Sequence, residues 1–243
     1  MPTALITGAS RGIGKAIAEL LASSGYQVLI NYRSSQAAAE TLLRSIRETQ
    51  GEALLYRANV ANRAEVQAMF DYCVAQFGGL DLLVNNAGIA KSNLCCDISE
   101  TEWDELIDVN LKSAFLCSQN ALRFMVPQKR GKIINISSIW GITGAACEVH
   151  YSAAKAGLIG LTKALAKELG PSNIQVNCIA PGVIATDMLA PYNSAEIAEL
   201  TEQTPLQRLG TPRDIAQCVL FLASDAANFI TGQVISPNGG FVI

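Results

Sequence analysis

Short apolar runs alternate with longer amphipathic stretches along the chain. The runs LITG, VLIN, LLVNN and IINIS are almost continuously apolar, which is typical of strands buried on both faces of a sheet. The predicted strands are Ala4–Thr7, Gln27–Tyr32, Ala53–Ala58, Leu80–Asn85, Lys132–Ser137, Ile174–Ile179 and Gly232–Ile235. The predicted helices are Gly14–Ser23, Gln36–Thr49, Ala64–Phe77, a long region Glu100–Met125 with Ser99 as N-cap, Tyr151–Leu169 and Asp214–Leu222.

Strands separated by helices of this length form βαβ units, in which the strands run parallel and helices cover both faces of the sheet. No linker or repeat interrupts the alternation, so residues 1–243 are predicted to form a single α/β domain. We expect a doubly wound, Rossmann-type parallel sheet of about seven strands, which binds its ligands at the carboxyl ends of the strands. Candidate functional residues therefore follow Thr7, Tyr32, Ala58, Asn85, Ser137 and Ile179.

Composition narrows the function classes. Half of the residues are apolar and 16% are charged, which excludes a disordered chain. No apolar run reaches the roughly 18 residues of a membrane span, and no signal-peptide pattern is present. A net charge of −3 argues against a nucleic-acid surface. The seven cysteines are odd in number and lack CxxC spacing, so we expect no disulfide framework, no metal site and a reducing, cytoplasmic location.

A glycine-rich turn follows the first predicted strand and opens into a helix. Glycines let backbone N–H groups approach a diphosphate closely, and the helix N-terminus adds a favourable dipole. The spacing is GxxxGxG rather than the common GxGxxG. We expect cofactor contacts along this turn from Gly8, Ser10, Arg11, Gly12, Ile13 and Gly14.

The residues after the second strand indicate which cofactor is bound. NAD-binding folds carry an acidic residue about 20 positions past the glycines, but Leu20 to Ala39 contains none. Arg33 stands there instead, and Arg11 lies in the glycine turn. Guanidinium groups suit a 2′-phosphate, so NADP(H) is the predicted cofactor; the alternative is that both arginines are ordinary surface charges.

Tyr151 and Lys155 are four residues apart on a predicted helix and therefore share one face. A nearby ammonium favours the phenolate, so we expect Lys155 to lower the pKa of Tyr151. Ser138 ends the fifth strand, where its hydroxyl can donate to a substrate carbonyl, and Asn110 lies within the long helix. A Tyr-x-x-x-Lys spacing is commonplace by itself and gains meaning from these neighbours.

Together, TGASRGIG, NNAG, Asn110, Ser138, YSAAK and Pro181-Gly182 resemble the short-chain dehydrogenase/reductase superfamily in order and spacing, over essentially the whole chain. The resemblance implies that Ser138 holds the carbonyl oxygen and Tyr151 delivers the proton. It implies that Lys155 binds the nicotinamide ribose and that Asn110 kinks its helix and holds a water linked to Lys155. Cofactor contacts are further implied at Arg33, Asn59, Val60, Asn86, Ala87, Gly88, Tyr151, Lys155, Pro181, Gly182, Ile184 and Thr186.

Within the superfamily the chain most resembles bacterial 3-oxoacyl-(acyl-carrier-protein) reductases, in length, in NNAG…VNLKSAF and in its ending. That resemblance implies NADPH-dependent ketone reduction in fatty acid biosynthesis, an acyl carrier protein as partner and a homotetramer, with a dimer as the alternative. Lys129, Arg130 and Lys132 supply a basic cluster for such a partner, but Ser172-Asn173 stands where an arginine often contributes.

The segment around Trp140 and Glu148 favours a different substrate. It resembles reductases that act on a 5-aminopentanone adduct on elongation factor P, and a carboxylate at Glu148 would suit an ammonium-bearing ketone. The predicted substrate contacts are Ser138, Trp140, Glu148 and Tyr151, unless Glu148 faces solvent. A non-catalytic nucleotide-sensing scaffold is the remaining alternative.

Four conspicuous residues receive structural interpretations. His150 is the only histidine and adjoins Tyr151, yet we assign it no chemical role. Cys95 and Cys96 are expected to pack internally, and Trp103 is expected to pack the long helix.

Overall fold

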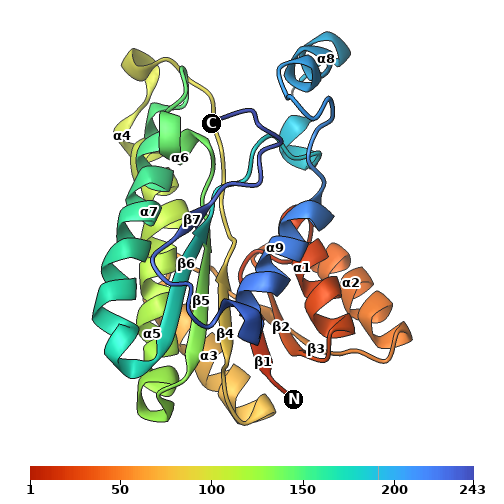
Figure 1. The fold of residues 1–243 in the computed structure, drawn as a ribbon, viewed down its shortest axis with the longest axis vertical. Coiled ribbons are helices and arrows are strands. Elements are labelled where there is room, and N and C mark those ends of the chain that lie inside the picture. Colours follow the sequence, from red (N-terminus) through yellow and green to blue (C-terminus); the bar gives the residue numbers. More distant parts are fainter. Residues whose placement is uncertain (191) are drawn as a thin grey trace.

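The computed structural model describes residues 1–190 and 192–243 of the chain. Its centre is a seven-stranded parallel sheet with the order β3-β2-β1-β4-β5-β6-β7 (Figure 1), which confirms the predicted fold class. The strands are β1 (Thr3–Ile6), β2 (Gln27–Tyr32), β3 (Glu52–Arg57), β4 (Leu82–Asn85), β5 (Gly131–Ile136), β6 (Ile174–Ile179) and β7 (Val234–Ile235).

The strand order reverses at β1, which pairs with β2 on one side and β4 on the other. Ile6 is in register with Ile30 of β2 and with Val84 of β4, so the segments that follow these strands emerge side by side. Such a reversal opens a crevice at the carboxyl ends of the strands. The glycine turn and the NNAG segment therefore flank the same crevice, as the sequence predicted.

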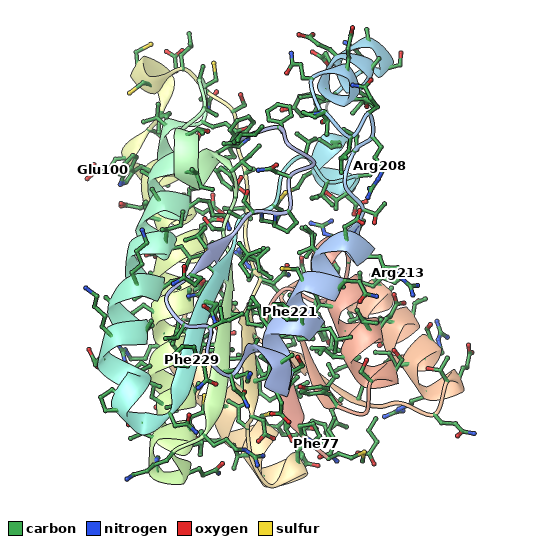
Figure 2. All side chains as sticks on the ribbon, in the orientation of Figure 1. Phe77, Glu100, Arg208, Arg213, Phe221 and Phe229 are labelled. Atoms are coloured by element: carbon green, nitrogen blue, oxygen red, sulfur yellow. The ribbon has the colours of Figure 1, made fainter. Side chains whose placement is uncertain are left out.

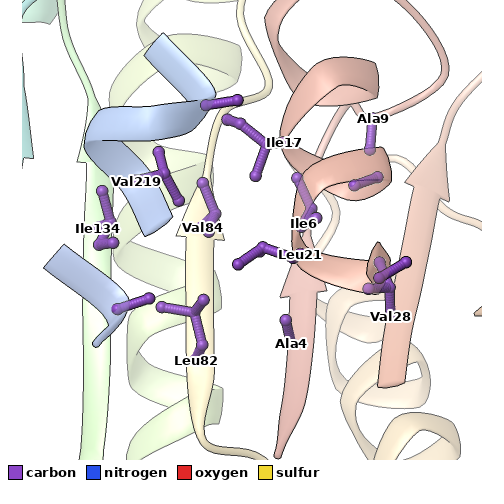
Figure 3. Packing of buried hydrophobic residues seen from close by; sticks show 14 of the residues in the cluster. Ala4, Ile6, Ala9, Ile17, Leu21, Val28, Leu82, Val84, Ile134 and Val219 are labelled. Atoms are coloured by element: carbon purple, nitrogen blue, oxygen red, sulfur yellow. The ribbon is translucent and has the colours of Figure 1, made fainter. Parts of the chain in front are cut away.

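Two layers of helices cover the sheet. The helices are α1 (Gly12–Ser23), α2 (Gln36–Glu48), α3 (Arg63–Phe77), α4 (Glu100–Ile107), α5 (Ser113–Gln128), α6 (Trp140–Thr143), α7 (Val149–Leu169), α8 (Ser194–Glu202) and α9 (Pro212–Ala223). One apolar core joins α1, α2 and α9 to the sheet; Figure 3 shows Ile17 and Leu21 of α1 and Val219 of α9 against strand residues such as Val84. The second core lies beneath α3, α5 and α7 on the opposite face.

The predicted long helix is interrupted. Asp108–Lys112 forms a π-helical turn, η2, between α4 and α5. The Asn110 amide donates to the carbonyl of Leu106 at 3.0 Å and to that of Ile89 at 2.9 Å. A side chain that bonds into the i→i−4 ladder is a common cause of such a bulge.

Three other elements differ clearly from the sequence prediction, the first being the four-residue helix α6, which was not predicted. The helix α8 was not predicted, because it is short and none of its residues is buried. Its signal is the capping box between Asn193 and Glu196, which satisfies the first amides of the helix. The last strand is shorter than predicted, with only Val234 and Ile235 in the ladder.

The predicted N-cap Ser99 is confirmed, since its hydroxyl accepts from the Glu102 amide. Within the described ranges, no helix combines the length and apolar character needed to cross a membrane.

Candidate active site

A cavity of about 760 Å³ lies at the carboxyl ends of the central strands. Its wall is made of the segments that follow β1, β2, β3, β4, β5 and β6, together with residues of α7 and the segment before α8. Of the predicted site residues, only Gly14 and Asn110 do not line it. The remaining ones do, namely Gly8, Ser10, Arg11, Gly12, Ile13, Arg33, Asn59, Val60, Asn86, Ala87, Gly88, Ser138, Trp140, Glu148, Tyr151, Lys155, Pro181, Gly182, Ile184 and Thr186.

The glycine turn depends on residues that have no β-carbon. Gly8 has φ +62°, and a Cβ on it would lie 2.8 Å from the Cα of Ala87. A Cβ on Gly14 would lie 2.5 Å from the Asn86 amide nitrogen, which donates to the carbonyl of Thr7 at 2.9 Å. Gly14 therefore contributes by permitting close packing between the turn and the NNAG segment, not by lining the cavity.

The end of the cavity beside β2 is basic. Arg33, Ser34 and Ser35 line it, and no carboxylate of the described lining lies in this segment. Arg11 approaches from the glycine turn, with its guanidinium 3.9 Å from the carboxylate of Asp187 and both side chains largely exposed. The two arginines that the sequence singled out thus line the same cavity.

The opposite end holds Ser138, Tyr151 and Lys155. They are 8%, 8% and 4% exposed, so packing holds each of them in place while all three line the cavity. The Lys155 ammonium donates to the carbonyl of Ile136 at 3.0 Å and lies 5.5 Å from the centre of the Tyr151 ring. The Ser137 hydroxyl donates to the carbonyl of Lys155 at 2.8 Å, which ties helix α7 to the end of β5.

The Lys155 ammonium does not lower the pKa of Tyr151 by itself, so the lowering expected from Lys155 together with a nicotinamide cation stays a prediction. Burial raises the pKa of Tyr151 to about 12, the Glu148 carboxylate adds to this rise, and the Ser138 hydroxyl opposes it through a hydrogen bond. Burial also lowers the pKa of Lys155 to about 8. Desolvation is the largest cause of both shifts, because both side chains have been removed from water. Tyr151 is therefore a neutral phenol at pH 7, which is the protonation state that an acid requires.

Asn110 does not line the cavity but contacts the backbone of Ile89, which does. Its amide oxygen accepts from the Ile89 amide at 3.3 Å, and the side chain is 1% exposed. A Cβ on Gly88 would lie 2.7 Å from this oxygen and 3.3 Å from the Lys155 ammonium. The π-helical turn thus presses Asn110 against the NNAG segment on the side facing Lys155.

Comparison with known proteins agrees with this geometry. A family described as enoyl-(acyl carrier protein) reductase matches residues 8–242. A 3-oxoacyl-[acyl-carrier-protein] reductase of Staphylococcus aureus (strain N315) is 48% identical over 98% of this chain and 97% of its own length. The corresponding reductases of Synechocystis sp. (strain ATCC 27184 / PCC 6803 / Kazusa) and Aquifex aeolicus (strain VF5) are each 45% identical, over 99% and 97% of this chain and 96% and 95% of their own.

The chain belongs to the short-chain dehydrogenase/reductase family. It is an NAD(P)-dependent oxidoreductase, as the sequence predicted. The interpretation as a non-catalytic scaffold fails, since the Ser, Tyr and Lys of this reductase line the cavity together.

The cavity wall of this reductase also contains aromatic residues whose contacts the sequence did not predict. Trp140 packs edge-to-face on Phe241 with ring centres 6.0 Å apart. Met188 and Tyr192, which precede α8, also line the cavity. In Figure 1, α8 stands at the same end of the sheet as α4 and α6. Glu148 lines the cavity as well and is half-buried, and this burial raises its pKa.

The four residues that received structural interpretations differ in their exposure. Cys95 and Cys96 are exposed, because they form a short 3₁₀ turn on the surface, so the prediction that they pack internally is wrong. Trp103 lies on α4 and is 39% exposed, so its side chain is only partly packed. His150 is completely buried and does not line the cavity.

The basic cluster of Lys129, Arg130 and Lys132 lies near the amino ends of the strands, whereas the cavity lies at their carboxyl ends. Lys129 and Arg130 precede β5, whereas Ser138 follows it, and six residues of strand span about 20 Å. The Lys132 ammonium donates to the carbonyl of Ser224 at 2.7 Å, and Arg130 forms an ion pair with Asp81. The cluster is therefore not part of the cavity rim of its own chain.

Proposed function

We propose that this protein is a cytoplasmic NADPH-dependent 3-oxoacyl-[acyl-carrier-protein] reductase, which converts the 3-oxo group of a carrier-bound acyl chain to a 3-hydroxyl group. The observation that carries this proposal is the shared cavity, with Ser138, Tyr151 and Lys155 at one end and a glycine turn flanked by arginines at the other. The 3-oxoacyl reductases, 45–48% identical over nearly the full chain, support the substrate class.

The residues present fit a phosphorylated dinucleotide. Gly8 and Gly12 have positive φ values, and the cradle between Gly8, Gly14 and Asn86 would be filled by a single β-carbon. That packing leaves the turn open to a diphosphate at the N-terminus of α1. Arg11 and Arg33 would hold the 2′-phosphate, and Asn59 and Val60 would border the adenine. Bound NADPH would supply the hydride, and the protein would supply orientation and the proton.

The proton comes from Tyr151. Its phenol is neutral at pH 7 and faces the cavity beside Ser138, whose hydroxyl would donate to the substrate carbonyl oxygen. As negative charge develops on that oxygen, a donor from Ser138 stabilises it and Tyr151 transfers its proton. Lys155 would hold the nicotinamide ribose through its ammonium and stabilise the phenolate left behind. Asn110 fixes the Gly88–Ile89 backbone against Lys155.

We further propose that the protein assembles as a homotetramer. Several large apolar side chains are exposed. Among them, Trp103 and Phe115 lie on α4 and α5. Phe221 lies on α9 and Phe229 follows that helix (Figure 2). Exposed apolar side chains on different helices allow two different two-fold interfaces, which is what a closed tetramer of this symmetry needs. Light scattering should give a mass near four times 25.8 kDa, and a mass near 25.8 kDa would refute the assembly.

A second candidate substrate is favoured by Glu148. This carboxylate lines the cavity three residues before Tyr151 and influences the titration of both Tyr151 and Tyr192. A 3-oxoacyl chain has no positive charge for it to bind. A ketone that carries an ammonium group, such as a 5-aminopentanone adduct on elongation factor P, would gain a charged hydrogen bond.

Replacing Glu148 with Gln separates the two substrates. If an amino-ketone is the natural substrate, its KM should rise about tenfold or more, since hydrogen bonds to charged groups contribute roughly 1.5–3 kcal/mol. The KM for acetoacetyl thioester should stay unchanged or fall slightly. Steady-state kinetics at low and moderate salt check this, because an effect of the general surface field would fade as salt is added. Equal changes for both substrates would remove the support for the amino-ketone.

NADPH oxidation in the presence of acetoacetyl-[acyl-carrier-protein] tests the main proposal directly. The parent enzyme should oxidise one NADPH for each 3-oxo group consumed. If only the amino-ketone were reduced, the protein would instead be assigned as a reductase in protein modification.

A further inference from the structure

A buried polar cluster connects helix α4 to the first turn of the catalytic helix α7. His150 is fully buried, and its Nε2 lies 3.1 Å from Oε1 of Glu102, whose side chain is 17% exposed. The same Oε1 accepts from the Asn93 side-chain amide at 2.8 Å. One carboxylate oxygen thus holds residues from the loop after β4 and from α7, which are far apart in the sequence.

The cluster continues into the loop 144–148, of which Glu148 lines the cavity. The Asn93 backbone amide donates to the carbonyl of Cys147 at 2.8 Å. Cys147 has φ +62°, a conformation that is costly for a residue with a side chain and persists only where the surroundings impose it. At the other end of the loop, the Ala145 amide donates to the Ser152 hydroxyl at 3.1 Å. The hydrogen bonds of Asn93 and Ser152 therefore hold the loop on which Glu148 is placed.

His150 is held there at a cost to folding. Because Nε2 faces a carboxylate, it carries a hydrogen and donates it. Nδ1 is buried and has no hydrogen-bond partner among the described residues, whichever protonation state the ring adopts. An unpaired buried polar atom is destabilising, and an apolar residue of similar shape would avoid this cost. Packing alone does not account for an imidazole at this position.

We propose that His150 is a positioning residue, which Glu102 and Asn93 lock in place so that Tyr151 and the 144–148 loop keep the geometry needed for proton transfer. The expected effect on the reaction rate rests on the proposed function. The hydrogen bonds that hold His150 in place, called the lock below, do not depend on it. His150 touches neither the cavity nor the reacting atoms and acts only through its neighbours in the chain. Small displacements of an acid from its acceptor are costly, which is why such a residue matters to rate.

The test uses the full-length protein and three variants of α4. Glu102→Ala removes the acceptor of both hydrogen bonds, and Glu102→Gln restores an acceptor oxygen without the charge. Glu105→Ala is the matched control, because Glu105 lies on the same helix, is about as exposed as its partner Lys91 and pairs with it at 3.0 Å. Three quantities are measured: amide hydrogen exchange of residues 144–152, NADPH binding by fluorescence, and kcat and KM for the ketone.

The lock predicts faster exchange of residues 144–152 in Glu102→Ala, exchange close to the parent in Glu102→Gln, and no change in Glu105→Ala. It predicts that kcat falls about tenfold or more in Glu102→Ala while NADPH affinity is preserved, with most of the rate regained in Glu102→Gln. Unchanged exchange in Glu102→Ala would refute the lock. Faster exchange with an unchanged kcat would refute the positioning role. If the parent fails to reduce any 3-oxoacyl thioester, the proposed function fails, while the exchange experiment still decides whether the lock exists.

Discussion

Replacing Tyr151 with Phe should abolish ketone reduction while leaving NADPH binding intact. The ring is buried and packs with Leu106 and Ala154, so Phe preserves the packing and removes only the hydroxyl. General acid catalysis contributes roughly 10²–10⁴-fold to rate, and we expect a loss of about that size in kcat. Steady-state assay of NADPH oxidation and titration of NADPH fluorescence measure the two properties separately.

The control for this variant is Tyr192→Phe. Tyr192 also lines the cavity, but it is 43% exposed and lies in the segment before α8. Its hydroxyl has no part in the proposed proton transfer, so the variant should keep most of its kcat. If Tyr151→Phe retained activity within about tenfold of the parent, another group would have to deliver the proton.

The double variant Arg11→Ala with Arg33→Ala should lose most of the preference for NADPH over NADH. A hydrogen bond to a charged group contributes roughly 1.5–3 kcal/mol, so each guanidinium that holds a 2′-phosphate changes kcat/KM for NADPH by about 10–100-fold. NADH lacks this phosphate, and its kcat/KM should change little. The ratio of the two values measures the effect without interference from losses common to both cofactors.

Arg44→Ala is a suitable control for lost surface charge. Arg44 lies on α2, outside the cavity lining, and its guanidinium donates to the Thr41 hydroxyl at 3.3 Å. The cofactor preference should survive this change. An unaltered ratio in the Arg11 and Arg33 double variant would show that the 2′-phosphate is recognised by other residues.

Much of the site could be predicted because it sits at strand ends. The residues after Thr7, Asn85 and Ser137 follow apolar runs that can only be buried parallel strands, and parallel strands bring their carboxyl ends to one edge. The four-residue spacing of Tyr151 and Lys155 likewise places both on one helical face. These inferences use local pattern and topology, and the cavity contains all of these positions.

What the sequence did not reveal depends on contacts between distant segments. No periodicity connects Trp140 to Phe241 or His150 to Glu102, because each pair meets only after the chain has folded. The direction of the Tyr151 pKa shift also depends on burial, which a Tyr-x-x-x-Lys spacing does not report. The helix α8 was missed because it is short and buries none of its residues.

The central claim is that this reductase acts on carrier-bound 3-oxoacyl chains with NADPH. The most direct measurement compares kcat/KM for acetoacetyl-[acyl-carrier-protein] with that for an amino-ketone carried on a lysine, using NADPH and the parent enzyme. We expect the carrier-bound thioester to be the better substrate by about tenfold or more, and its reduction to disappear in Tyr151→Phe. Reduction of the amino-ketone with no detectable turnover of acetoacetyl-[acyl-carrier-protein] would contradict the account.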